Sequence, residues 1–63
     1  MNRIDSYPLG CRHGIRKLSE LLCTDYQTVY AMMLLTASLM DLYPGDQRVI
    51  DMILKDCKVE VQA

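Results

Sequence analysis

The amino-acid sequence predicts an all-α protein: a compact three-helix domain whose helices span about 12–22, 25–42 and 46–58. Three observations support this fold class. Apolar residues recur at helical spacing in three separate segments, residues typical of turns and caps separate those segments, and 51% of the 63 residues are hydrophobic. A domain of this size buries only about 60% of the surface of its unfolded chain. We therefore expect the remaining apolar surface to make the protein a homodimer through its long central helix.

Residues 1–10 show no helical period, and they include a proline and a glycine, which interrupt regular structure. We expect an N-terminal arm that either packs on the domain through Tyr7 and Leu9 or frays. Residues 11–58 then form a single helical domain. In the C-terminal tail, 59–63, the alternating pattern allows an extension of the third helix, a short strand or fraying, and we favour fraying.

The first helix is predicted from Ile15, Leu18 and Leu22, which fall on one helical face. Basic side chains crowd its first turns, where positive charge opposes the helix dipole. These residues are Arg12, His13, Arg16 and Lys17. They predict either a local anion site, for DNA phosphate or an acidic protein surface, or an ordinary solvated face on which Arg16 pairs with Glu20.

The start of the second helix is marked by Thr24 and Gln27, which form the capping-box pattern T-x-x-Q. In this pattern the threonine oxygen accepts the backbone N–H of the glutamine, whose side chain reaches back. Asp25 adds negative charge at the positive end of the helix dipole. No helix breaker follows until Pro44, so we expect the helix to reach Leu42 and to be about 27 Å long.

The predicted central helix is apolar over most of its circumference, and residues 26–40 contain no Asp, Glu, Lys or Arg. Such a helix is normally buried, yet two short flanking helices cannot cover all of it. One side carries Val29, Tyr30, Met33, Ala37 and Met40. We expect the dimer interface on another side, formed by Met32, Leu35, Leu39 and Leu42.

The third helix is predicted to begin at or near Asp46, after the turn formed by residues 43–46, and to end near Lys58. Asp51 and Lys55 have the i, i+4 spacing and order of a favourable ion pair. The apolar face of this helix consists of Val49, Ile50, Ile53, Leu54 and Cys57.

Residues 15–34 place small and apolar side chains where two packed helices and a tight turn require them. These positions hold Leu18, Ser19, Leu22, Cys23, Val29 and Met32. In this pattern the segment resembles a helix-turn-helix motif, although a glycine usually occupies the turn position that Cys23 holds. The resemblance implies a DNA-binding dimer in which Gln27 reads bases and Tyr26 touches phosphate. Further phosphate contacts would come from Arg12, Arg16 and Lys17.

Cys11, Cys23 and Cys57 form an odd set without the paired spacing of a disulfide framework or a zinc knuckle. Together with His13 they allow a Cys3His zinc site, but we favour Cys23 and Cys57 as small buried hydrophobes and Cys11 as a loop residue. No nucleophile–base set, phosphate loop or dinucleotide motif occurs. The sequence therefore predicts no enzyme activity, no metal, no cofactor and no small-molecule substrate.

The formal charge of −1 and the pI of about 5.6 differ from the basic character typical of a free-standing DNA-binding domain. No apolar segment approaches the roughly 20 residues of a spanning helix. No signal-peptide pattern follows the first residues either. We therefore expect a cytoplasmic protein without membrane contact.

The favoured function is protein–protein interaction. We expect a small dimeric regulator or inhibitor that docks on a larger host protein, of a kind that phages and mobile elements often encode. Its partner surface would combine tyrosine and apolar anchors with a basic rim. That surface consists of Tyr26, Tyr30, Leu34, Arg12, Arg16 and Lys17. The alternative is a dimeric helix-turn-helix transcription regulator that contacts DNA through Arg12, Arg16, Lys17, Tyr26 and Gln27.

Overall fold

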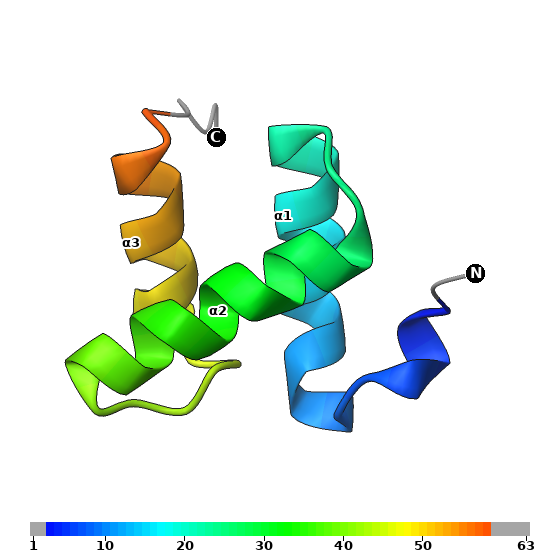
Figure 1. Cartoon of the computed structure of the whole chain (residues 1–63), viewed down its shortest axis with the longest axis horizontal. Coiled ribbons are helices and arrows are strands. Elements are labelled where there is room, and N and C mark those ends of the chain that lie inside the picture. The colour runs from blue at the N-terminus through cyan, green and yellow to red at the C-terminus, as the bar shows by residue number, and fades with distance from the viewer. Residues whose placement is uncertain (1–2, 59–63) are drawn as a thin grey trace.

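The computed structural model describes residues 3–58, and within that range all regular structure is helical. Two short 3-10 helices, η1 (Ile4–Ser6) and η2 (Leu9–Cys11), precede three α-helices, α1 (Arg12–Leu22), α2 (Tyr26–Met40) and α3 (Gln47–Asp56). Helices α1 and α3 lie side by side, and α2 crosses both of them (Figure 1). The predicted all-α, three-helix fold is confirmed. The predicted tail at 59–63 lies outside the described residues.

The core lies where the three α-helices meet, and among the described residues no polar or charged side chain is buried in it. Helix α2 faces the core with Val29, Met33 and Ala37. The domain is therefore stabilised mainly by removal of apolar surface from water. The buried apolar residues are Cys11, Ile15, Leu18, Val29, Met33, Ala37, Val49, Ile50, Ile53 and Leu54.

Helix α1 has the predicted bounds, and its end is a left-handed cap. Cys23 follows the helix with φ 54° and ψ 47°, and its N–H donates to the carbonyl of Ser19. The N–H of Thr24 also donates to Ser19, at 3.1 Å. Both bonds go to the same carbonyl oxygen, which the end of the helix would otherwise leave unpaired.

The predicted capping box at the start of α2 is wrong. Asp25, not Thr24, is the residue that precedes the helix, and no side chain caps its backbone. The Asp25 carboxylate instead accepts the Thr28 hydroxyl at 2.5 Å and the Thr24 hydroxyl at 3.4 Å. The hydrogen bond from Thr28 is the main reason why the pKa of Asp25 lies below its ordinary value.

Helix α2 ends at Met40, two residues before the predicted end. Asp41 takes a left-handed conformation, with φ 57°. The N–H of Leu42 then donates to the carbonyl of Ala37 at 2.9 Å, the long bond typical of a Schellman motif. The helix of 15 residues is therefore about 22 Å long instead of the predicted 27 Å.

Helix α3 begins as predicted, with Asp46 as its N-cap. The Asp46 carboxylate accepts the backbone N–H of Arg48 at 2.9 Å. Within residues 3–58 the only ion pair joins the side chains of Asp46 and Arg48, with 3.4 Å between the carboxylate oxygen and the guanidinium Nε. The predicted pairs Asp51–Lys55 and Arg16–Glu20 are therefore not formed. Asp51 instead accepts the side-chain amide of Gln47 at 2.9 Å.

The last turn of α3 differs from the prediction. The helix ends at Asp56, about two residues early, and Lys58 is left-handed with φ 56°. Cys57, predicted to belong to the buried face, is exposed. The other four members of that predicted face are buried: Val49, Ile50, Ile53 and Leu54.

The N-terminal arm is structured, and it reaches the loop between α2 and α3. Tyr7 packs against the core as one of the two predicted anchors, whereas Leu9, the other, is 77% exposed. A Cβ on Gly45 would collide with the carbonyl group of Gly10, and one on Gly10 would lie 2.7 Å from the Tyr43 hydroxyl oxygen. Glycine at both positions thus allows the arm and the loop to touch.

Candidate interaction surfaces

The largest exposed apolar side chains of α2 form what we call the leucine row: Leu34, Leu35 and Leu39. They are 42%, 65% and 81% exposed. Exposed residues at helical spacing around them, Ala31 and Ser38, are small. Because the helix has no ionisable carboxyl or basic side chain, the row lies on a face without formal charge. Exposed apolar residues grouped in this way are typical of interaction sites.

The residues predicted to form the dimer interface divide into two kinds. Leu35 and Leu39 are exposed members of the leucine row. Met32 and Leu42 are partly buried and pack against the core. An interface on this side of α2 would therefore use the first two as protruding contacts and the second two as its edge.

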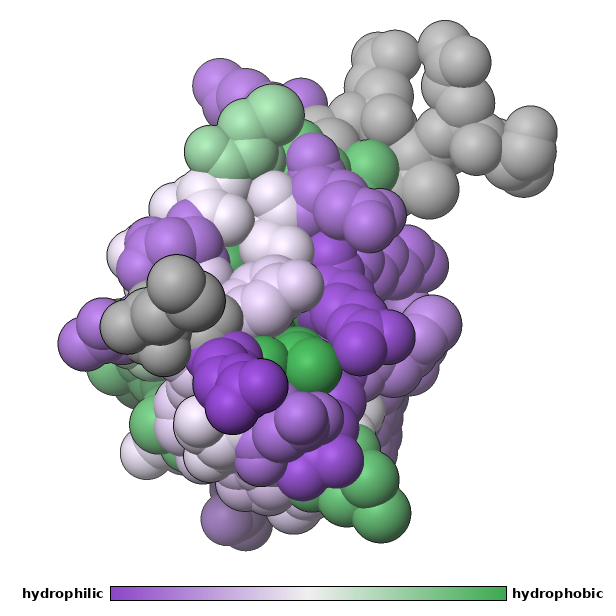
Figure 2. All heavy atoms as spheres, turned by 90° about the vertical axis from the view of Figure 1, so that its right-hand side faces the viewer, coloured by the Kyte–Doolittle hydropathy of each residue, from purple (hydrophilic) through white to green (hydrophobic). Residues whose placement is uncertain are grey.

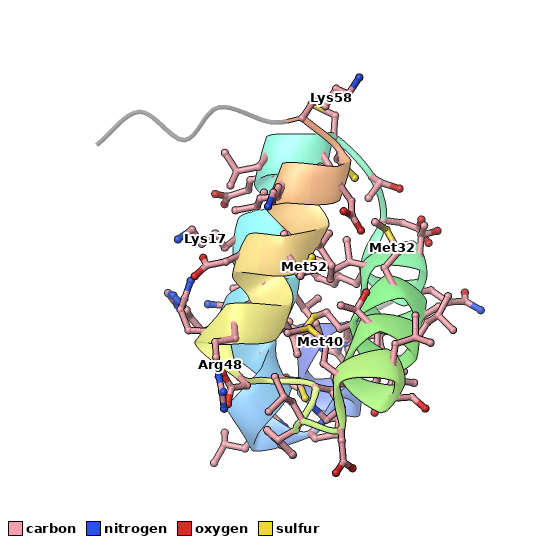
Figure 3. All side chains as sticks on the ribbon, turned by 90° about the vertical axis from the view of Figure 1, so that its left-hand side faces the viewer. Lys17, Met32, Met40, Arg48, Met52 and Lys58 are labelled. Carbon is pink, nitrogen blue, oxygen red and sulfur yellow. The ribbon has the colours of Figure 1, made fainter. Side chains whose placement is uncertain are left out.

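Methionines lie at the contact between α2 and α3. Met40 of α2 and Met52 of α3 lie between the two helices, and Met32 lies farther along α2 (Figure 3). Met52 is 36% exposed, and Met32 and Met40 are half-buried. Methionine side chains adapt to irregular surfaces, so the contact between these helices has an adaptable apolar edge.

Tyr26 and Tyr30, the predicted partner anchors, already have an intramolecular partner. The ring of Tyr7 lies edge-on to both of them, with centroid distances of 6.5 Å to Tyr26 and 5.1 Å to Tyr30. All three rings are half-buried. Edge-to-face packing of this kind is a favourable aromatic geometry. We call these three residues the tyrosine cluster.

Arg12 is engaged by the same arm. Its Nε donates to the carbonyl of Tyr7 and its Nη2 to the carbonyl of Asp5, each at 3.0 Å. Arg12 thus helps to hold the arm on the domain, a role that the sequence did not indicate.

The other predicted basic residues lie farther along α1. Arg16 and His13 are exposed, and Lys17 is half-buried. Hydrophilic residues cover much of the side of the molecule that carries the arm (Figure 2). Gln27, the predicted base-reading residue, is exposed as well. The assignment of these residues to a protein partner or to DNA stays a prediction.

The three cysteines have the reverse of the predicted burial. Cys11, predicted to lie in a loop, is buried in η2, whereas Cys23 and Cys57, predicted to be buried, are exposed. The Cys11 thiol donates to the Tyr43 hydroxyl oxygen, with a distance of 3.7 Å between sulfur and oxygen. The hydrogen bond between these two side chains is the main reason why the pKa of Tyr43 lies above its ordinary value. Within the part of the chain that the structure describes, no three potential metal ligands come together.

The contacts of the arm are the part of the site that sequence reasoning missed. Tyr7 was expected to pack on the domain, but not against the tyrosines predicted to bind a partner. No periodicity connects Tyr7 to Tyr30, because the arm lies outside the helical pattern. Helical periodicity does not predict the close approach of Gly10 to Gly45 either. Two glycines in turns are a weak signal for such a contact.

A comparison with protein-family models, with curated proteins and with solved structures found no match to this chain. None of the helices in residues 3–58 combines the length and apolar character needed to cross a membrane.

Proposed function

We propose that this chain is a small helical protein–protein interaction module, which forms a homodimer and regulates or inhibits a larger protein by docking on it. The observation that carries the proposal is the leucine row on the uncharged face of α2. Large apolar side chains at 65% and 81% exposure lose hydrophobic stabilisation unless another surface covers them. A face without formal charge can meet a second copy of itself without repulsion between like charges.

The dimer uses the side of α2 that carries Leu35 and Leu39, and the larger partner uses the side that carries Leu34 and the tyrosines. Leu35 and Leu39 meet their counterparts in the second copy, with Met32 and Leu42 at the edge. The partner contacts Leu34 and the tyrosines, with the basic residues of α1 as the rim. Aromatic anchors inside a polar rim are typical of energetically important contacts in protein interfaces.

Sedimentation of the full chain at micromolar concentration tests the dimer. We expect a mass twice the 7.2 kDa of the single chain. The double variant Leu35→Ser, Leu39→Ser should sediment as a monomer. Leu9→Ser is the matched control, because it makes the same change at a site that is 77% exposed on the arm. A monomer mass for the wild-type chain would refute the dimer.

Affinity capture from the source organism's lysate tests docking on a larger protein. The proposal requires one identified protein that the wild type and Leu9→Ser retain and that Leu34→Ser and Arg16→Ala lose. If the four chains retain the same proteins, the partner surface is wrongly placed.

The alternative function, a dimeric helix-turn-helix regulator, makes a different prediction. Binding to duplex DNA would depend on phosphate contacts, so it should be measurable at low salt and weaken steeply as the salt concentration rises. The observation that supports this alternative is the exposure of Gln27 and Arg16, the predicted base and phosphate contacts. Absence of binding even at low ionic strength would exclude it.

A further inference from the structure

The arm is held on the domain like a bound peptide. Tyr7 supplies one aromatic ring, which packs 5.1 Å from the ring of Tyr30 and 6.5 Å from that of Tyr26. Two main-chain carbonyl groups, of Asp5 and Tyr7, accept both hydrogen bonds from Arg12. An aromatic side chain and main-chain carbonyls are features that a segment of another protein can also offer.

Opening of residues 3–7 would remove the partly buried Ile4 and Tyr7 from the edge of the core, but no fully buried residue. No residue from 3 to 10 is fully buried, and Pro8, Leu9 and Gly10 are exposed. Cys11, by contrast, is fully buried and belongs to the core. Residues 3–7 are therefore connected to the core through the exposed segment 8–10, in which Gly10 keeps its contact with the α2–α3 loop. Segments with few buried contacts open locally at low free-energy cost.

Opening of the arm would change the chemistry of the surface beneath it. The rings of Tyr26 and Tyr30 would lose their cover, and the Arg12 guanidinium would regain two free donors. The arm lies beside α1 and the first turns of α2 (Figure 1). The uncovered surface would thus be continuous with Leu34, which α2 exposes one turn beyond Tyr30.

We propose that Tyr26, Tyr30 and Arg12 form a docking site for an aromatic-containing peptide segment, and that the chain's own arm occupies this site until the partner's segment displaces it. The arm then regulates partner binding by competition. This inference rests on the proposed function, because it names the kind of segment that the larger protein presents. A tethered arm competes at an effective concentration of about a millimolar, so a partner segment must bind more tightly than the arm does.

A peptide with the sequence of residues 3–9, added to the full chain carrying Tyr7→Ala, tests the site. The variant keeps Tyr26, Tyr30 and Arg12 but loses the ring that occupies the site. We expect nuclear magnetic resonance signals of Tyr26 and Tyr30 to shift and to saturate at about millimolar peptide. If the wild-type arm is closed about 90% of the time, the same peptide should bind the wild-type chain about tenfold more weakly.

The controls separate a specific site from weak adhesion. Adding Arg12→Gln to the Tyr7→Ala chain should weaken peptide binding, and a peptide with alanine in place of its tyrosine should not bind. Equal binding to all chains, or no shift of Tyr26 and Tyr30 in a folded Tyr7→Ala chain, would overturn the proposal. Unfolding of the Tyr7→Ala chain would overturn it as well, because the arm would then be part of the core. The sedimentation experiment tests only the dimer formed by the leucine row. A monomer mass would therefore refute the dimer without changing the outcome of the peptide-binding experiment.

Discussion

Cys23 adopts a left-handed backbone, with φ 54°, at the end of α1. For a residue other than glycine this conformation costs about 1–2 kcal/mol. Glycine removes that cost, but it also makes the unfolded chain more flexible, so only part of the cost is recovered as stability. We expect Cys23→Gly to raise the free energy of unfolding by about 0.5–1 kcal/mol. Urea denaturation measures it. Cys23→Ala removes the thiol but keeps the strain, so equal stability of the two variants would contradict this account.

Asp46 couples the start of α3 to pH. The backbone N–H of Arg48 is the main cause that lowers the pKa of this carboxyl below its ordinary value of 3.8. A carboxyl with a lowered pKa in the folded state stabilises the protein above its unfolded pKa, and that stabilisation is lost as the pH falls through the folded pKa. Asp46→Ala should therefore be less stable than the wild type at pH 7, and the difference should shrink below pH 3.8.

Thermal unfolding from pH 2 to pH 7 checks the Asp46 prediction. The difference between variant and wild type cancels the titration of Asp25, which both chains share. Asp46→Asn keeps an N-cap acceptor but has no titrating group, so it should be the more stable variant near neutral pH. A difference between Asp46→Ala and the wild type that does not vary with pH would contradict the assignment.

The cysteines show why the burial of a single residue is hard to predict from sequence. Cys11 is buried because η2 packs near Tyr43, which is 32 positions away in the chain. Cys57 follows the apolar face of α3, yet the helix ends one residue before it. Both outcomes depend on contacts or ends of elements, and helical periodicity carries no information on either.

At the scale of elements, helices were predicted more reliably than their ends. The apolar periodicity gave all three helices and the bounds of α1. The end of α2 was predicted too late because Asp41, not glycine, takes the left-handed position there. Its start was misassigned because Thr24 and Asp25 are both good N-cap residues, and the choice depends on local geometry that the sequence leaves open.

The contact between the arm and the α2–α3 loop predicts a strong effect of one methyl group. A Cβ on Gly45 would collide with the Gly10 carbonyl and lie 2.7 Å from the Tyr43 ring. The Gly10 carbonyl belongs to the main chain, so it can make room for this methyl group only if the arm and the loop separate. Gly45→Ala should therefore lower the free energy of unfolding by about 1–3 kcal/mol, measured by urea denaturation.

Gly14→Ala is the matched comparison for Gly45→Ala. There a Cβ would meet the ends of the Ile50 and Met33 side chains, at 2.8 Å and 3.1 Å. Side-chain ends can rotate away, and alanine is favoured over glycine within a helix by about 1 kcal/mol. The net loss should be smaller than for Gly45→Ala. A larger loss for Gly14→Ala would show that the arm and loop separate easily.

For the whole molecule, the exposure of apolar side chains on α2 could be predicted from the sequence, whereas the cover over two tyrosines could not. The exposure of Leu34, Leu35 and Leu39 agrees with the argument that two short flanking helices cannot cover an apolar central helix. The cover over Tyr26 and Tyr30 was missed because it depends on where an arm without periodicity folds back. Amphipathic pattern thus predicts the face of a helix, whereas contacts between segments distant in the chain require the fold.

If the leucine row forms the dimer, the thermal stability of the protein must depend on its concentration. Association stabilises only the folded state, so a hundredfold rise in concentration adds about 2.7 kcal/mol per dimer. With the usual unfolding entropy per residue, a dimer of this size should gain about 10 °C in Tm over that range. The variant Leu35→Ser, Leu39→Ser should instead melt at one temperature at all concentrations, because exposed substitutions leave the core of each copy intact. Leu9→Ser should keep the wild-type slope. A wild-type Tm that does not change with concentration would mean that the leucine row stays uncovered by a second copy, and the larger partner would then be the remaining proposed cover.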